Sequence, residues 1–383
     1  MQKVLIVGAG LSGATCARIL AENGFEVELI DKNNHIGGNV YDEMQNGIIV
    51  QKYGPHIFHT NNENVYNFLK QFTKGFRFHH TVKANINGKF VPVPFNLDSL
   101  HALYPEEEAN KIEEFLVTEY GEGNKVPIME LKQNPNPMIR DFADFVFKNV
   151  FEYYTTKQWG RSVDQLDPNI MKRVPVYISR NDKYFTDKFQ YQPTNGFTVM
   201  VQNMLNHPNI KIKLGVDAKN VLKFDNNEIL YNNQPVSEDI VFSGAIDDLL
   251  NNKFGKLPYR TLEFKYETYN TDSYQNAPVV NYTVDQNYTR ISEFKKFTSQ
   301  NPNTTSTIIV KEYPLEYTNE TQIPYYPIVN EDNLNKYKKY VEYIKDYPNF
   351  HLIGRLGNYK YINMDVAVND AIELAKSIIE KTK

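Results

Sequence analysis

Three glycines near the N-terminus have the spacing of a dinucleotide-binding turn. Gly8, Gly10 and Gly13 follow a short apolar run in the pattern G-x-G-x-x-G, and a helical pattern comes next. The first glycine allows the backbone angles of the turn, the second lets the main chain approach a pyrophosphate, and the third lets the helix pack closely on the strand. The helix N-terminus would hold the pyrophosphate. Asp31 ends the second apolar run, where an acid holds a ribose hydroxyl.

The segment after Asp31 indicates which dinucleotide is bound. A glycine pair, Gly37-Gly38, stands where a nicotinamide enzyme would continue into another strand and helix. A flavin protein wraps this segment along FAD and returns its closing strand and helix from the far end of the chain. Residues 349–353 have the pattern of that strand, and 365–383 that of a helix with one apolar side. FAD is therefore favoured over NAD, and an ordinary loop at Gly37-Gly38 is the alternative.

Two histidines lie three residues apart in the loop 53–60. His56 and His59 could suggest a metal site, but no second cysteine and no acidic cluster accompanies them. We therefore predict no metal and expect this loop to face the flavin. A buried loop with hydrogen-bonded histidines is the alternative.

Aromatic residues and arginines supply candidates for binding a nucleotide. The segment 153–161 carries the one tryptophan, Trp159, and can stack on a base and act as a lid, with a packing anchor as the alternative. Arg173 and Arg290 lie in or beside extended segments, where their guanidinium groups suit a diphosphate. Ordinary surface arginines are the alternative. No Ser-His-Asp triad or carboxylate pair emerges, so a cofactor must supply the chemistry.

Hydrophobic patterning predicts the elements that position these residues. Residues 171–194 and 257–328 are extended, which suggests an antiparallel sheet, and 82–93 predict a hairpin with its turn at Asn87-Gly88. The expected helices cover residues 63–72, 97–103, 105–120, 141–154 and 197–205, and further strands are expected at 211–214 and 239–243.

These elements predict an α/β fold with interleaved parts. We expect an FAD-binding Rossmann-like domain with an inserted helical domain and an antiparallel β-sheet domain. The FAD-binding domain would comprise residues 1–80, 196–250 and 330–383, the helical insertion with its substrate lid 96–165, and the sheet domain that binds substrate 81–95, 166–195 and 251–329.

Composition narrows the class of protein. A chain of 383 residues is too long for one simple core, and a net charge of −4 provides no general field for nucleic acid or anionic lipid. The single cysteine, Cys16, suits a reducing cytosol. No apolar stretch is long enough to span a membrane and no signal peptide is apparent, so we expect a cytoplasmic protein without nucleic-acid partners.

Taken together, these segments resemble the bacterial UDP-galactopyranose mutases along essentially the whole chain. The matching strings, in order, are Gly8–Gly13, His35–Asn39, Gly54–Thr60, Tyr154–Gly160, Lys172–Pro175, Asn181–Phe185, Tyr288–Arg290, Lys311–Glu316, Pro324–Pro327 and Gly354–Gly357. Each string is short, but their number, order and spacing are specific to that family.

The resemblance implies a ring contraction without net redox change. Members interconvert UDP-galactopyranose and UDP-galactofuranose with reduced FAD, whose N5 attacks the anomeric carbon and expels UDP. The sugar opens to a flavin iminium, recloses through another hydroxyl and is recaptured by UDP. The resemblance also implies a homodimer that supplies galactofuranose for cell-surface glycans.

The resemblance assigns roles by matching position. Arg173 and Arg290 would clamp the diphosphate, with Arg173 on a mobile lid, and His59 would lie close to the flavin and the sugar. The matched substrate-contacting positions are Tyr154, Trp159, Arg173, Tyr184, Asn281, Arg290, Glu312, Tyr326 and Tyr361. The matched or motif-derived flavin contacts are Gly8, Gly10, Ser12, Gly13, Asp31, Lys32, Gly38, Asn39, His56, Ile57, Arg355, Met364, Asp365, Val366, Ala367, Val368 and Asn369.

Two positions depart from the family pattern. Asn363 stands where many members have an acid, and this departure bears on the tuning of the flavin. His80 stands where a substrate-side asparagine can occur, and this departure bears on recognition of the base.

Two other functions are alternatives to this one. A flavin oxidoreductase of the amine-oxidase or desaturase type is the second hypothesis, and a flavin-bearing binding protein is the third. Neither of these needs a diphosphate clamp.

Overall fold

The strand that leads into the glycine turn belongs to a five-stranded parallel sheet. The computed structural model describes residues 2–160, 175–284, 286–298, 304–319 and 321–382. The strand order is β12-β2-β1-β16-β22, and every pair is parallel. The bounds are β1 Lys3–Val7, β2 Glu26–Asp31, β12 Ile210–Leu214, β16 Asp239–Phe242 and β22 Phe350–Leu352. The closing strand therefore comes from the far end of the chain, which confirms that prediction.

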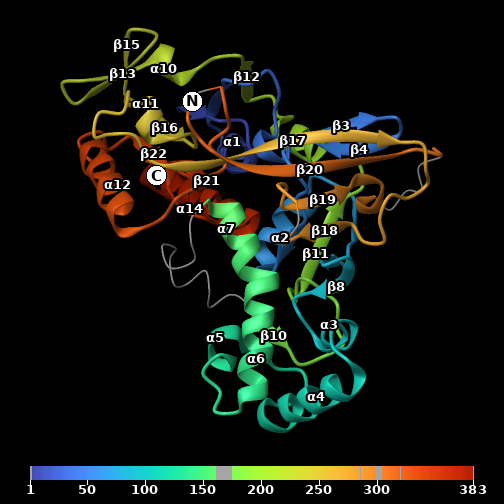
Figure 1. Ribbon diagram of the computed structural model, residues 1–383. Coiled ribbons are helices and arrows are strands. Elements are labelled where there is room, and N and C mark those ends of the chain that lie inside the picture. The colour runs from blue at the N-terminus through green and yellow to red at the C-terminus, as the bar shows by residue number, and fades with distance from the viewer. Residues whose placement is uncertain (1, 161–174, 285, 299–303, 320, 383) are drawn as a thin grey trace.

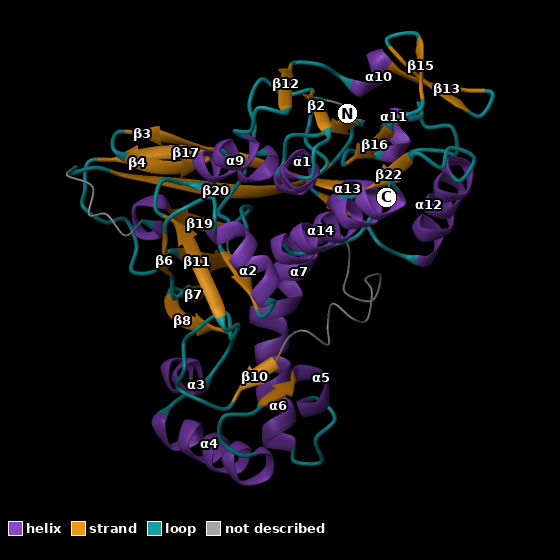
Figure 2. Ribbon diagram, turned by 180° about the vertical axis from the view of Figure 1, so that it is seen from behind, coloured by secondary structure: helices purple, strands orange, loops and turns teal. Residues whose placement is uncertain are grey.

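Alternating side chains of this sheet enter two different cores. Ile6 and Leu29 join the core formed with α1, α9 and α14, whereas Leu5 and Ile30 join a second core that includes α11 and α12. Figure 2 shows α1, α9 and α14 gathered on one side of the molecule, and α1 packs against both other helices. The helix bounds are α1 Leu11–Glu22, α9 Phe197–Leu205, α10 Ala218–Val221, α11 Ile246–Leu249, α12 Glu331–Ile344 and α14 Met364–Lys381. A separate small sheet consists of β13 Leu222–Asp225, β14 Glu228–Tyr231 and β15 Gln234–Val236.

A seven-stranded sheet lies beside the parallel one. Its order is β21-β17-β20-β19-β18-β7-β8, and only the β18–β7 pair is parallel. The predicted hairpin is confirmed, with Asn87 and Gly88 both at positive φ. The bounds are β7 Val82–Ile86, β8 Lys89–Val93, β17 Tyr259–Tyr269, β18 Val279–Tyr282, β19 Arg290–Glu293, β20 Thr307–Glu316 and β21 Tyr326–Pro327.

A helical part projects from the two sheets. Figure 1 shows one long rod, made of α6, a π-helical segment and α7, running from α4 and α5 up to the sheets. The prediction placed this helix at 141–154, but it begins at Pro137, where Asn136 caps Met138 N, and ends before Gly160. The bounds are α3 Leu97–Leu103, α4 Glu106–Tyr120, β9 Lys125–Pro127, α5 Ile128–Leu131, α6 Pro137–Val146, the π segment Phe147–Glu152 and α7 Tyr153–Trp159.

The strands between residues 171 and 194 differ from the prediction. β11, Phe189–Pro193, lies between β5, Phe58–Thr60, and β6, Gly75–Arg77, in a separate three-stranded sheet, and β10, Pro175–Tyr177, pairs with β9. Neither strand joins the seven-stranded sheet. The prediction missed this because a run of extended residues does not reveal which strand it pairs with. Among the described residues, the remaining α-helices and strands are β3 Asp42–Gln45, β4 Ile48–Gln51, α2 Glu63–Lys70 and α13 Gly354–Gly357, and two short 3-10 helices cover Gly38–Val40 and Phe294–Phe297. The division into three domains stays a prediction.

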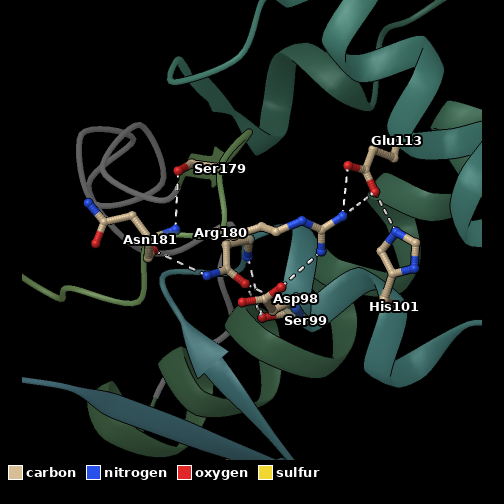
Figure 3. A network of polar contacts seen from close by, with 8 residues as sticks. Asp98, Ser99, His101, Glu113, Ser179, Arg180 and Asn181 are labelled. Carbon is tan, nitrogen blue, oxygen red and sulfur yellow. Dashed lines mark hydrogen bonds and ion pairs between the residues drawn. The ribbon is translucent and has the colours of Figure 1, made fainter.

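A polar network fixes the segment that follows β10 onto the helical part. Arg180 donates from Nη1 to Asp98 and from Nη2 to both oxygens of Glu113, at 2.9 Å each, and Glu113 also contacts His101 (Figure 3). Arg180 is half exposed, so these bonds orient the loop more than they stabilise the fold.

Among the described residues, no helix is both long enough and apolar enough to cross a bilayer.

Candidate functional site

The glycine turn has the close contacts that its spacing predicts. Gly8 adopts φ +113°, and a Cβ on Gly13 would lie 1.9 Å from Gly8 O, so no side chain fits where α1 packs against the end of β1. Gly10 is the N-cap of α1 and has no side-chain cap, which leaves the first N–H groups of the helix available to an anion.

A cavity of about 380 Å³ opens above this turn. It is bounded by the helix N-terminus, the ends of the parallel strands and the start of α14, a shape and set of donors that fit a dinucleotide. Eleven predicted flavin contacts line it, namely Gly8, Gly10, Ser12, Asp31, Lys32, Gly38, Asn39, His56, Arg355, Met364 and Ala367, and the divergent Asn363 also lines it.

Asp31 organises the turn as well as lining the cavity. Its carboxylate accepts hydrogen bonds from Ala9 N and Asn33 N, both at 2.7 Å. Each oxygen keeps a second lone pair, so the side chain can still accept a ribose hydroxyl. Asp31 thus lines the cavity beside the glycine turn, and its contact with a ribose stays a prediction.

The other predicted flavin positions do not line this cavity. Gly13 lies in the first turn of α1, with its Cα against the backbone of Gly8, and Val368 is a fully buried residue of α14. Asp365 accepts from Thr60 Oγ1 at 2.9 Å and Asn369 accepts from Asn62 Nδ2 at 3.0 Å, which fixes the start of α14 against β5 and α2. Ile57 is partly buried against the core that α3, α4, α5 and α6 share with the seven-stranded sheet, and Val366 is exposed.

His56 is held neutral at the cavity wall. Its Nδ1 lies 2.9 Å from Gly54 O, and its Nε2 lies 3.5 Å from the hydroxyl of Tyr325. Burial, and then the charge of Arg355, lowers the pKa of His56 to about 4. The imidazole can therefore contact a ligand without adding a positive charge at neutral pH.

A second cavity of about 840 Å³ lies beside the seven-stranded sheet. Several aromatic rings and Arg290 contribute to its wall, which suits a ligand with a base, a sugar and phosphates. Seven predicted substrate contacts line it, namely Tyr154, Trp159, Tyr184, Asn281, Arg290, Tyr326 and Tyr361. The segment carrying Arg173 lies outside the described residues.

Strand register places two polar residues of this wall, Asn281 and Arg290, in one row with Glu312. Asn281 on β18 lies opposite Arg290 on β19, and Arg290 lies opposite Glu312 on β20. Directly opposed residues of antiparallel strands project from the same face, so the three side chains are neighbours. Ala84 continues the row on β7, and its small side chain leaves room in the cavity.

Glu312 acts behind Arg290 and does not line the cavity. Arg290 Nε donates to Glu312 Oε1 at 2.7 Å, and Glu312 is almost fully buried. Burial is the largest single effect and lowers the pKa of Arg290, but the attraction of Glu312, the neighbouring Tyr154 and Tyr326 and the hydrogen bond to Glu312 together outweigh it, and the pKa lies well above its usual value. Burial also raises the pKa of Tyr154 and Tyr326, so their hydroxyls stay protonated donors.

The two cavities adjoin at an aromatic wall. Ile362 lines both, and Arg355 Nη2 donates to Ile362 O at 2.7 Å. The guanidinium of Arg355 also lies 5.4 Å from the ring centre of Tyr326 and 5.2 Å from that of Tyr361. The two cavities therefore share part of one wall.

His59 lines neither cavity, but it lies one ring away from the second. Its imidazole stacks on Phe185 with ring centres 3.7 Å apart, and Phe185 packs against Tyr184, which lines the cavity. His80, the second divergent residue, is buried against Phe185 and Tyr184.

Sequence reasoning missed several residues that line the second cavity, and two of them lie in one unusual helical segment. Val150 and Phe151 belong to the π-helical segment just before Tyr154 and line the second cavity. Their aromatic and apolar spacing along the helix was a usable signal, but the π turn changes which face they occupy, and no residue type marks such a turn.

Comparison with known proteins assigns this arrangement to a family. A family model described as UDP-galactopyranose mutase matches residues 149–361, and one for NAD(P)-binding Rossmann-like domains matches residues 6–72. The dTDP-fucopyranose mutase of Escherichia coli is 37% identical over the whole of both chains. The probable UDP-galactopyranose mutase of Klebsiella pneumoniae is 35% identical over 99% of this chain and 95% of its own.

Two further comparisons agree. The UDP-galactopyranose mutase of Mycoplasma genitalium is 34% identical over 98% of this chain and 94% of its own. A crystal structure of reduced UDP-galactopyranose mutase superposes with a TM-score of 0.75 at 16% identity, covering 99% of this chain and 96% of that one, and so shares the fold. The chain belongs to the UDP-galactopyranose mutase family of isomerases, and this membership implies a flavin cofactor.

Proposed function

We propose that this protein interconverts UDP-galactopyranose and UDP-galactofuranose with reduced FAD. The observation that carries the proposal is Arg290, a cation fixed by a buried carboxylate in the wall of a cavity that adjoins the glycine-lined one. Family membership supports the reaction, and the position of Arg290 supports a nucleoside diphosphate as the substrate class.

The residues of the chain bind, orient and neutralise charge in this proposal. The guanidinium of Arg290 receives the diphosphate, on which negative charge accumulates when the bond to the anomeric carbon breaks. Tyr154, Tyr326 and Tyr361 offer hydroxyl donors around it, and Trp159 offers a stacking surface for the base. Reduced flavin, when bound, supplies the covalent chemistry at its N5 atom that the resemblance implies.

Several finer points belong to the same proposal. Arg173 would complete the diphosphate clamp, and His59 would lie beside the flavin and the sugar. A homodimer in the cytoplasm that provides galactofuranose for cell-surface glycans is supported by family resemblance and by the single cysteine. The three-domain division is supported by the separate parallel and seven-stranded sheets.

A second candidate substrate is a dTDP-linked 6-deoxyhexose. The dTDP-fucopyranose mutase of Escherichia coli is 37% identical over the full length of both chains, compared with 35% for the probable UDP-galactopyranose mutase of Klebsiella pneumoniae. The reaction class is the same, because only the base, the ribose and the C6 substituent of the sugar change.

The test is turnover under anaerobic conditions. The protein is reduced with dithionite and given UDP-galactofuranose or dTDP-fucofuranose, and each pyranose product is measured by chromatography. We expect conversion only with reduced flavin, and the ratio of kcat/KM values identifies the preferred substrate. Conversion that is absent with both substrates, or equal with oxidised enzyme, would overturn the proposal.

A further inference from the structure

A lysine on α7 joins that helix to the pair of strands that carries Arg290. Lys157 Nζ donates to Tyr282 O at 2.7 Å and to Tyr288 O at 3.3 Å. Tyr282 is the last residue of β18, and Tyr288 lies two residues before Arg290, which begins β19. Because β18 and β19 are paired, both carbonyls lie at the same end of the strand pair, and one ammonium group binds them together.

A second cation holds the same helix from another strand. The buried Arg260 donates from Nε to Gln158 O at 3.2 Å, and Arg260 lies on β17 opposite Tyr326 on β21. Gln158 is in the last turn of α7, where the carbonyl groups have no partner within the helix. Two contacts with different strands therefore determine where the end of α7, at the top of the rod in Figure 1, lies against the seven-stranded sheet.

The two elements that Lys157 joins line one cavity. The helix contributes Tyr154 and Trp159, whose rings suit a base, and the strand pair contributes Asn281 and Arg290, whose guanidinium suits phosphates. Lys157 does not line this cavity but lies behind its wall. Its hydrogen bonds therefore set the separation between the aromatic part of the wall and the cation.

We propose that Lys157 is a positioning residue that fixes the aromatic side chains of α7 at a set distance from Arg290, so that one nucleoside diphosphate contacts both at once. A wall whose parts are already in place avoids the entropic cost of ordering them when the ligand binds. The nucleoside diphosphate rests on the proposed function. The placement of α7 follows from the contacts of Lys157 and can be tested without a ligand.

Three variants of lysines isolate the role of the ammonium group. Lys157→Met keeps the length and the apolar stem of the side chain but removes the donor, whereas Lys157→Arg keeps a charged group with several N–H donors. Lys148→Met changes an exposed lysine of the π-helical segment in the same rod and is the matched control. If Lys157→Met fails to retain flavin, Lys157→Gln, which keeps one neutral donor group, takes its place.

The first experiment measures nucleotide affinity in two backgrounds. UDP and dTDP are titrated into the flavin-bound protein, and the emission of Trp159 gives the Kd. We expect Lys157→Met to raise the Kd by about tenfold or more, Lys157→Arg to recover most of the affinity, and Lys148→Met to match the wild type. In Arg290→Ala, adding Lys157→Met should change the Kd by less than about twofold, because no cation is left to position.

This double-mutant cycle distinguishes positioning from a general loss of structure. A merely structural defect would weaken binding by the same factor with and without Arg290. An equal effect of Lys157→Met in both backgrounds, or an unchanged Kd in Lys157→Met alone, would therefore overturn the inference.

The second experiment needs no nucleotide. Acrylamide quenching of Trp159, the only tryptophan, reports how firmly the end of α7 is held in the flavin-bound protein. The quenching constant should rise by about 1.5-fold or more in Lys157→Met and stay unchanged in Lys148→Met. Equal quenching of the wild type and Lys157→Met would overturn the inference. If the wild type binds neither nucleotide, the proposed function fails, while the quenching result still decides whether Lys157 holds α7.

Discussion

Arg290 donates a hydrogen bond from Nε to Glu312 Oε1 at 2.7 Å, and within the described residues its two terminal amino groups make no hydrogen bond. The buried carboxylate therefore holds the guanidinium in place while its outer edge stays available in the larger cavity. That edge has the planar pair of donors that suits two phosphate oxygens. The relationship explains how a chain with net negative charge can bind a dianionic group.

Arg290→Ala should nearly abolish turnover while the protein keeps its flavin. The substitution removes the cation that meets the diphosphate but leaves the glycine-lined cavity intact, so kcat/KM should fall by about a hundredfold or more. Arg77→Ala, an exposed arginine on β6, is the matched control. Near-normal turnover of Arg290→Ala would show that the diphosphate binds elsewhere.

Trp159 should report nucleotide binding directly. It is the only tryptophan in the chain and lines the larger cavity, so UDP or dTDP should change its fluorescence in a saturable way. Arg290→Ala should weaken this binding by about tenfold or more, because a charged hydrogen bond is lost. Trp159→Phe should remove the signal. An emission unaffected by either nucleotide would contradict the placement of the base.

Two glycine variants should separate folding from flavin binding. A Cβ on Gly10 would meet only Gly38 Cα at 3.7 Å, whereas one on Gly13 would meet Gly8 O at 1.9 Å. Gly10→Ala should therefore fold but bind FAD more weakly, since it blocks the close approach of the pyrophosphate. Gly13→Ala should lower the Tm of the flavin-free protein. Flavin absorption and thermal unfolding measure the two effects, and equal behaviour of the variants would contradict this account.

His80 should make the protein sensitive to acid. Burial, and then the charges of Arg290 and His59, lowers the pKa of His80 to about 3. The unfolded chain, with a histidine pKa of about 6.5, binds one more proton between these values, so stability is lost as the pH falls through this range. The free energy of unfolding should fall by about 1.4 kcal/mol per pH unit more steeply in the wild type than in His80→Leu. Urea unfolding between pH 7 and pH 4 measures both slopes, with His79→Leu as the exposed control, and identical slopes for wild type and His80→Leu would refute the prediction.

Local patterns predicted more of this molecule than long-range pairings did. The glycine turn, the Asn87-Gly88 hairpin and the helix Phe197–Leu205 depend on neighbouring residues, and all three are confirmed. The residues that the structure adds to the picture depend on register instead. Glu312 reaches Arg290 only because two strands align, and Lys157 reaches both Tyr282 O and Tyr288 O only because β18 pairs with β19, which no local pattern specifies.

The arginine roles show the same limit. Arg290 was assigned to the diphosphate by resemblance, since its residue type alone is that of an ordinary surface arginine. What distinguishes it is the buried carboxylate beside it, and burial of Glu312 is a property of the packed sheet. The helix that carries Trp159 likewise began earlier than its periodicity indicated, although the pair Asn136-Pro137 was a readable start signal.

The most direct measurement is a crystal structure of the reduced, flavin-bound protein with UDP-galactopyranose. We predict that phosphate oxygens contact the terminal amino groups of Arg290 in the larger cavity and that the hexose lies against the flavin ring where the two cavities meet. A diphosphate out of reach of Arg290, or a hexose remote from the flavin, would contradict the account.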